Sequence, residues 1–231
     1  MTTATREPRA AAGAVSRIGA ILSARGINPN AGTAANPVPE QVTALDLADA
    51  RIPPRYRHAL PNHPRVTAWI AEIASTGRSG PGGVPGIATG PSLLIAGPTG
   101  TGKTHHAYGA IRGLLGEGVR LRWEATTLAD LYAAQRPQHG TDPEQQLWRL
   151  ARSPLLLLDD LGAAKQSQWT EELTYRLVNH RYNQLLPTLV TTNLPVAELR
   201  DAVGDRVASR LSEMTERVIL TGRDRRRHPA G

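Results

Sequence analysis

The stretch GPTGTGKT, Gly97–Thr104, decides the fold. It fits the pattern G-x-x-x-x-G-K-[ST] and stands between an apolar run, SLLIA (Ser92–Ala96), and a helical pattern that begins at Lys103. A loop in this position turns backbone N–H groups and a helix N-terminus toward phosphate groups. Lys103 would reach the β- and γ-phosphate oxygens, and the Thr104 hydroxyl would bind Mg²⁺. The expected nucleotide-binding residues are Gly97, Pro98, Thr99, Gly100, Thr101, Gly102, Lys103 and Thr104.

Lysine usage supports the same interpretation. The chain has 25 arginines and only two lysines, Lys103 and Lys165. An ammonium is compact, whereas a broad guanidinium would crowd a phosphate-binding loop. A chain that otherwise uses arginine therefore has lysine where a P-loop needs it.

The run SPLLLLDDLG, Ser153–Gly162, places four leucines directly before two aspartates. A leucine run between Pro154 and Gly162 predicts a strand covered on both faces, as in a parallel sheet. Adjacent carboxylates at the end of such a strand are costly unless a cation, a charge or water meets them. Beside a P-loop, Asp159 would hold Mg²⁺ through a water, and Asp160 would polarise the attacking water. The alternative is a core strand that runs out into a polar turn.

Strand and helix patterns alternate from Ser92 to Gly222, which predicts a parallel three-layer α/β sheet. One strand pattern differs from the others. In VRLRWE, residues 119–124, apolar and charged residues alternate, and a strand with one wet face is expected at an edge of the sheet. Ahead of the sheet, PRVTAWIAEIAS (Pro64–Ser75) predicts an amphipathic helix.

Composition divides the chain into four expected regions. Residues 1–40 are a flexible extension with one short helix for partner binding, and residues 41–90 are a helical linker. Residues 91–222 form the nucleotide-binding core, and residues 223–231 form a basic disordered tail. The net charge of +7 divides into +4 for residues 1–90 (9 basic, 5 acidic), 0 for the core (14 of each) and +3 for the tail (4 basic, 1 acidic). Since the core is balanced, global charge does not establish DNA binding.

Several classes of protein are excluded by composition. The chain has no cysteine, so it has no disulfide and no thiolate metal site. No apolar run approaches the ~18 residues that a membrane span needs. Arg17 interrupts the alanine-rich N-terminus before a signal-like apolar core forms. We expect a cytoplasmic protein without membrane contact.

Two further stretches point to one family. TLVTTN ends a third buried strand with Asn193, whose amide is suited to positioning water near a γ-phosphate. DRVASRLSEM places Arg206 and Arg210 four residues apart, on one face of a helix. Together with the P-loop, these features resemble an AAA+ ATPase, with Walker A at Gly97–Thr104, Walker B at Leu155–Asp160, sensor 1 at Asn193 and box VII ending in SRL.

Within AAA+ the sequence is similar to the DnaC/IstB-like group of bacterial helicase loaders and transposition helpers. The resemblance runs from about Ile52 to Gly222 and is densest in GKTHHA, LLLLDDLGAAKQSQWTEEL, NHRYNQLLPTLVTTNLP and DRVASRLSEM. It implies a five-stranded sheet in the order 5-1-4-3-2, and ATP hydrolysis with Mg²⁺ in DNA replication, as a helicase loader. It also implies that Asp160, Asn193 and Arg210 are catalytic, the last as an arginine finger on a neighbouring subunit's ATP. The implied partners are a replicative DNA helicase or a transposase, single-stranded DNA and further copies of the chain.

The sequence departs from the wider AAA+ pattern in two places. Glu is usual at the second Walker B acid, and Asp160 is one methylene shorter, which predicts slow turnover. Only 11 residues follow Leu220, so no full C-terminal lid is expected, and Arg225 or Arg226 would have to substitute for the sensor 2 arginine.

For DNA contact, the family resemblance indicates the stretch LYAAQRPQHGTDPEQQLWRLAR, residues 131–152, as a helical insertion that meets single-stranded DNA. Gln145, Arg149 and Arg152 share one helical face, and Arg136 ends the preceding helix. Stacking of bases on Tyr132 or Trp148 would add to such contacts. The alternatives are that these aromatics pack in the core and that the basic tail binds the DNA.

Three other functions compete with the helicase loader. An IstB-like transposition helper shares the core and differs in its partner. A nucleotide-gated adaptor would bind ATP and DNA with little turnover, which the shorter Asp160 favours. A P-loop kinase would leave TTN and SRL unexplained.

Overall fold

The structure is a computed structural model of the chain, and it describes residues 50–79, 85–87, 89–136, 140, 142–163 and 167–222. The expected N-terminal extension and the basic tail, with Arg225 and Arg226, lie outside the described residues. The elements in chain order are η1 (Pro54–Tyr56), α3 (Pro64–Thr76), β1 (Arg78–Ser79), β2 (Pro85–Gly86), β3 (Ser92–Ala96), α4 (Lys103–Gly116), β4 (Trp123–Thr127), α5 (Leu128–Ala134), α6 (Pro143–Ala151), β5 (Leu155–Asp159), α7 (Gln168–Asn183), β6 (Thr188–Thr192), η2 (Val196–Glu198), α8 (Leu199–Val203), α9 (Asp205–Met214) and β7 (Thr215–Ile219).

Five strands form one parallel sheet in the order β4-β5-β6-β3-β7. If the P-loop strand β3 is counted as the first, this is the order 5-1-4-3-2, and the prediction is confirmed. In β3, Leu93 pairs with Leu189 of β6 on one side and with Glu216 of β7 on the other. Because all five strands run in one direction, the segments that follow β3, β5 and β6 meet at the same edge of the sheet.

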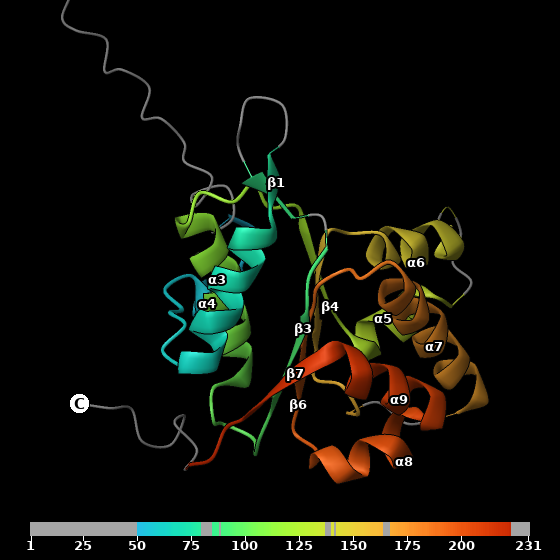
Figure 1. Cartoon of the computed structure of the whole chain (residues 1–231). Helices are drawn as coiled ribbons and strands as arrows, with labels where there is room; N and C mark the ends of the chain where they lie inside the picture. Colours follow the sequence, from blue (N-terminus) through green and yellow to red (C-terminus); the bar gives the residue numbers. More distant parts are fainter. Residues whose placement is uncertain are drawn as a thin grey trace, which may run out of the picture. The chain divides into compact units, whose positions relative to one another are not determined.

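Helices cover both faces of this sheet, as Figure 1 shows: α3 and α4 lie on one face, and α5 to α9 lie on the other. The four leucines of β5 divide between the two cores. Leu155 and Leu157 pack in the core beside α3 and α4, whereas Leu156 and Leu158 pack in the core beside the other helices. All four have 0% of their surface exposed, which confirms that this strand is buried on both faces.

The edge strand β4 is where predicted, but its start was predicted wrongly. The alternation in residues 119–122 is real, since Val119 is buried and Arg120 is exposed. However, the register with β5 begins only at Trp123, although the Leu155 N–H donates to the Arg122 carbonyl at 3.3 Å. Arg120 instead forms an isolated bridge with Gly86.

The predicted helix ahead of the sheet is confirmed as α3. The His63 side chain caps it by accepting a hydrogen bond from the Arg65 N–H. Its apolar face packs against α4, and its buried residues are Val66, Trp69, Ile70 and Ile73. In the described part of the chain, no helix is long and apolar enough to cross a membrane.

A buried arginine on α7 connects α6, α7 and β6 in the core that lies beside α5 to α9. Arg181 is 1% exposed, and its guanidinium donates to the carbonyls of Ala151, Ser153 and Pro187 at 3.2, 2.8 and 2.6 Å. It also donates to the Thr188 hydroxyl at 2.7 Å. Burial lowers the pKa of Arg181 to about 9, which leaves it protonated at neutral pH. One cation thus satisfies the carbonyls at the end of α6 and those before β6.

Candidate nucleotide-binding site

The loop Gly97–Gly102 leads from β3 into α4, and two of its glycines are required sterically. Gly102 precedes the helix with φ 96°, a left-handed conformation that side chains disfavour. At Gly97, which has φ 154°, a Cβ atom would lie 2.3 Å from the carbonyl oxygen of Leu220. The Gly97 N–H donates to the Thr192 carbonyl at 3.2 Å, so the loop begins beside the end of β6.

Thr104 and Asp159, the two residues expected to hold Mg²⁺, are hydrogen-bonded to each other at the carboxyl edge of the sheet. The Thr104 hydroxyl donates to Asp159, at 3.1 Å from Oδ1 and 3.3 Å from Oδ2. Lys103 is 8% exposed, and its Nζ donates to the Pro98 carbonyl at 3.0 Å, across the loop. A hydroxyl beside a carboxylate is a set of oxygen donors that fits Mg²⁺.

Sequence reasoning missed Thr191, which fixes both Walker B aspartates. Its side chain is 1% exposed and its hydroxyl donates to Asp159 Oδ1 at 2.5 Å. The same hydroxyl accepts the N–H of Asp160 at 2.9 Å. The only signal in the sequence was a polar residue within a buried strand, and its partners are set by the pairing of β5 with β6.

The two expected catalytic side chains at the ends of β5 and β6 are exposed. Asp160 has φ 60°, a left-handed conformation that Asp and Asn adopt more readily than other side chains. Its backbone is held in place because its own N–H and that of Leu161 both bond to Thr191, the latter at 2.7 Å. Asn193 directly follows β6, next to the residue that accepts the Gly97 N–H.

Arg210, the expected arginine finger, lies on α9 and is held by its own chain. Its Nε donates to Asn179 at 3.3 Å, and its Nη1 lies 3.8 Å from Glu213. Its guanidinium stacks over the ring of Tyr182 on α7, 4.5 Å from the centroid. The neighbouring Arg206 stacks in the same way on Tyr175, at 4.3 Å. Arg210 does not line the pocket at its own P-loop.

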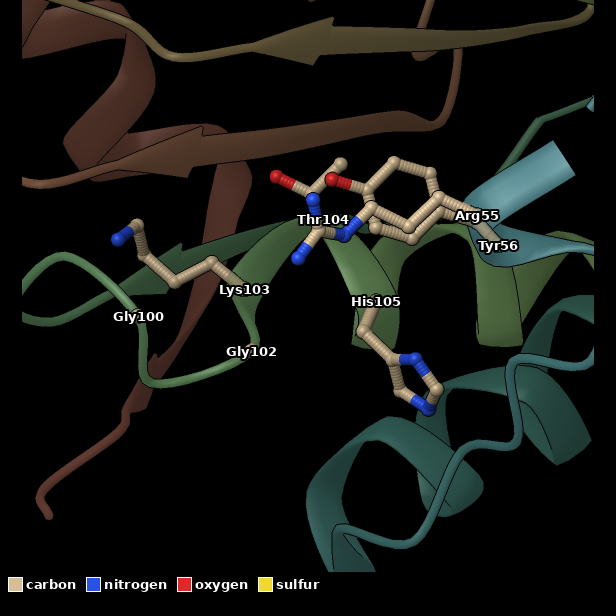
Figure 2. A pocket seen from close by; sticks show the side chains of 7 residues that line it. All are labelled: Arg55, Tyr56, Gly100, Gly102, Lys103, Thr104 and His105. Carbon is tan, nitrogen blue, oxygen red and sulfur yellow. The ribbon is translucent and has the colours of Figure 1, made fainter. Parts of the chain in front are cut away.

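That pocket has a volume of about 270 Å³ and includes residues from the segment ahead of α3. Gly100, Gly102, Lys103, Thr104 and His105 line it together with Arg55 and Tyr56. Figure 2 shows the side chains of Arg55 and Tyr56 close to Thr104, whereas His105 points away from them. Sequence reasoning missed Arg55 and Tyr56, because only the packing of η1 against α4 brings them to the loop.

An aromatic pair connects η1 to the helix of the P-loop. The rings of Tyr56 and Tyr108 stack with their centroids 5.1 Å apart. Burial, with the nearby charge of Asp159 and then Tyr56, raises the pKa of Tyr108 to about 12. The Tyr108 phenol therefore stays neutral at physiological pH and adds no charge beside Asp159.

Of the three arginines expected to contact DNA, two lie together and the third lies elsewhere. Arg149 and Arg152 line one groove on the α6 side, with Gln145, as their shared helical face predicts. Arg136 follows α5 and is not among the residues that line this groove. Arg149 donates to Glu124 Oε1 through both Nε and Nη2, at 3.2 and 2.9 Å.

The strand order, the P-loop on an inner strand and the acidic strand end beside it define a P-loop ATP-binding domain of the AAA+ class. The family described as IstB-like ATP binding protein matches residues 86–221, more than half of the chain, and the chain belongs to this family.

Relatives and solved structures agree with this assignment. The chain is 30% identical to the replicative helicase loader DnaC of Escherichia coli (strain K12) over 123 residues, 52% of this chain and 49% of that protein. It is also 30% identical to a putative insertion sequence ATP-binding protein of Sinorhizobium fredii over 114 residues, 48% of this chain and 37% of that one. The crystal structure of the DnaC helicase loader matches with a TM-score of 0.60 and 26% identity, covering 72% of this chain and 99% of that one. The chain thus spans about half the length, or less, of these two curated relatives.

Proposed function

We propose that this chain binds and hydrolyses ATP with Mg²⁺ and acts as a helicase loader in DNA replication. The observation that carries the proposal is the hydrogen-bonded group of Thr104, Asp159 and Thr191 beside Lys103. A P-loop lysine, a metal-binding hydroxyl and an oriented carboxylate are the parts that phosphoryl transfer needs.

Each residue has one role in the proposed reaction. Lys103 would exchange the Pro98 carbonyl for β- and γ-phosphate oxygens. Thr104 and Asp159 would hold Mg²⁺, which neutralises the charge that develops on the phosphates. Asp160 would accept a proton or hydrogen bond from the attacking water, and the Asn193 amide would hold that water in line.

Arg210 would complete the site of a neighbouring subunit. It is held by Asn179, Tyr182 and Glu213 in its own chain, so we infer that it leaves these contacts when copies assemble through the ATP site. An arginine finger supplied in trans contributes ~10³–10⁵ in rate. Hydrolysis by an isolated subunit would therefore be slow.

Two kinds of partner remain for this ATPase. A helicase is preferred because the DnaC helicase loader matches along 99% of its crystallised chain, with 26% identity. The insertion sequence relative, at the same 30% identity as DnaC, supports a transposition helper as the second candidate. With either partner, single-stranded DNA is a proposed ligand.

A third candidate function is an adaptor that binds nucleotide and DNA with little turnover. The exposed side chain of Asp160, which is shorter than the usual Glu, favours this candidate.

The ATP site is tested by equilibrium binding of a fluorescent ATP analogue with Mg²⁺ to the full chain. Lys103→Ala should weaken binding by about 10–100-fold, because a charge-assisted hydrogen bond contributes about 1.5–3 kcal/mol. Lys165→Ala removes the only other lysine and should bind like the wild type. Unchanged affinity of the Lys103 variant would contradict the P-loop assignment.

The partner is tested by retaining purified replicative helicase, and separately a purified transposase, on the immobilised full chain. We expect ATP-dependent retention of the helicase and none with Lys103→Ala. Retention of the transposase alone would favour the transposition helper.

A further inference from the structure

The segment ahead of α3 that contains η1 is fixed to the core at three points. Ile52 and Ala59 are each 1% exposed and belong to the core beside α3 and α4. Between them, the ring of Tyr56 stacks on that of Tyr108. These contacts hold one side of the segment against the protein, whereas Arg55 is exposed on η1. The backbone that carries Arg55 is therefore held in place beside the P-loop.

The stacking partner of Tyr56 shows from which side η1 approaches the helix of the P-loop. Tyr108 lies four residues after Thr104, on the same face of α4. The Thr104 hydroxyl donates to Asp159, and the charge of Asp159 contributes to the raised pKa of Tyr108. The η1 segment thus reaches α4 on the side where the two residues proposed to hold Mg²⁺ meet.

Arg55 brings a second basic side chain to the pocket at the P-loop. The described residues that line this pocket include one lysine, Lys103, and one arginine, Arg55. In Figure 2 the Arg55 side chain reaches from η1 toward Thr104, whereas the Lys103 side chain extends in the other direction along the loop. Among the residues that the structure describes, no carboxylate forms an ion pair with Arg55. Its guanidinium can therefore bind an anion that enters the pocket.

We propose that Arg55 binds the γ-phosphate of the ATP held by the P-loop of its own chain. Mg²⁺ on Thr104 and Asp159 would bridge the β- and γ-phosphates, so a guanidinium beside Thr104 would lie at that end of the nucleotide. A guanidinium can bind two phosphate oxygens with parallel hydrogen bonds. This role rests on the proposed ATP binding, and it adds a residue that distinguishes ATP from ADP.

The same segment offers the base of the nucleotide less than it offers a phosphate. One face of the Tyr56 ring is already covered by Tyr108, and η1 meets α4 beside the proposed metal ligands. Since ADP has no γ-phosphate, Arg55 would keep its solvent contacts when ADP is bound. Arg55 should therefore contribute to the affinity for ATP and little to the affinity for ADP.

The test measures the affinities of the full chain for ADP and for a non-hydrolysable ATP analogue, each with Mg²⁺. Arg55→Gln should weaken binding of the ATP analogue about tenfold or more, because it removes a charge-assisted hydrogen bond. The affinity for ADP should change little. Arg55→Lys keeps the charge and should retain part of the preference for the ATP analogue.

Arg57→Gln is the matched control. It removes the same charge two residues further along, from an exposed side chain that bonds to the Ile52 carbonyl at 3.4 Å. Both nucleotide affinities should stay near those of the wild type. A thermal melt of each variant checks that the segment still packs on the core.

The outcomes separate this role from its alternatives. Equal losses of affinity for the ATP analogue and for ADP in Arg55→Gln would overturn the γ-phosphate contact in favour of the base or the inner phosphates. Affinities equal to those of Arg57→Gln would overturn any nucleotide contact. A loss seen only at concentrations at which subunits assemble would overturn action within one chain. If the wild type binds neither nucleotide, the proposed function fails as well, whereas binding that needs Lys103 but not Arg55 contradicts the Arg55 role alone.

Discussion

At the scale of single residues, the Thr191 hydroxyl positions both Walker B acids. Thr191→Val keeps the shape of the side chain and removes the bonds to Asp159 and to the Asp160 N–H. We expect the Mg²⁺ concentration for half-maximal nucleotide binding to rise about 10–100-fold, as for other groups that orient a metal ligand. A Mg²⁺ titration at fixed nucleotide measures this.

Thr191→Ser is the matched control, because it keeps the hydroxyl and should restore the wild-type Mg²⁺ requirement. A thermal melt of each variant accompanies the titration. If Thr191→Val melts earlier but needs no more Mg²⁺ than the wild type, Thr191 is only a packing residue.

Asp160 is the second residue whose chemistry is testable alone. Asn tolerates the left-handed φ of 60° about as well as Asp, so Asp160→Asn changes the charge and spares the backbone. Nucleotide affinity should stay near that of the wild type, and turnover should fall about 10²–10⁴-fold, the usual contribution of a general base. Turnover equal to that of the wild type would mean that Asp160 does not polarise the water. A wild type that itself turns over negligibly, even with single-stranded DNA, would favour the adaptor.

At the scale of elements, Arg181 joins α6, α7 and β6 through carbonyl oxygens. Arg181→Met should lower the free energy of unfolding by about 3 kcal/mol or more, because several buried carbonyls lose their donor at about 1–3 kcal/mol each. Urea unfolding measures the loss. Arg176→Ala, on the same helix, removes an ion pair with the exposed Glu144 and should cost less than about 1 kcal/mol. Equal losses in the two variants would contradict the joining role.

Helices and strands could be predicted from the sequence where a local pattern, on one face or in one loop, determines them. The leucines of β5 and the amphipathic face of α3 each carry a local periodic signal, and both elements form as predicted. The start of β4 was missed because Val119 is buried without belonging to the sheet, so burial alone gave the signal of a strand.

The same distinction holds for the candidate site: continuous motifs could be predicted, whereas contacts between distant segments could not. The P-loop and the two acids are contiguous motifs, so sequence locates them. Arg55 and Tyr56 reach the pocket only through the packing of η1 on α4, and Thr191 meets Asp159 only through the register of two strands. Such contacts between segments distant in sequence have no local pattern that would predict them.

At the scale of the whole molecule, we propose that the ATP site is completed between subunits. Turnover per subunit should then rise steeply with protein concentration. Arg210→Ala should bind nucleotide and hydrolyse little at any concentration, about 10³-fold or more below the assembled wild type. Arg206→Ala, which removes the equivalent arginine–tyrosine contact one turn earlier on α9, should retain more activity.

The most direct measurement mixes Arg210→Ala with Lys103→Ala and follows ATP hydrolysis. The first variant keeps a nucleotide site and the second keeps the arginine, so mixed interfaces should recover part of the activity that each variant lacks alone. Recovery that depends on the mixing ratio is the result we predict. No recovery, together with a lowered melting temperature of Arg210→Ala, would contradict the claim and leave Arg210 as a structural partner of Asn179, Tyr182 and Glu213 within its own chain.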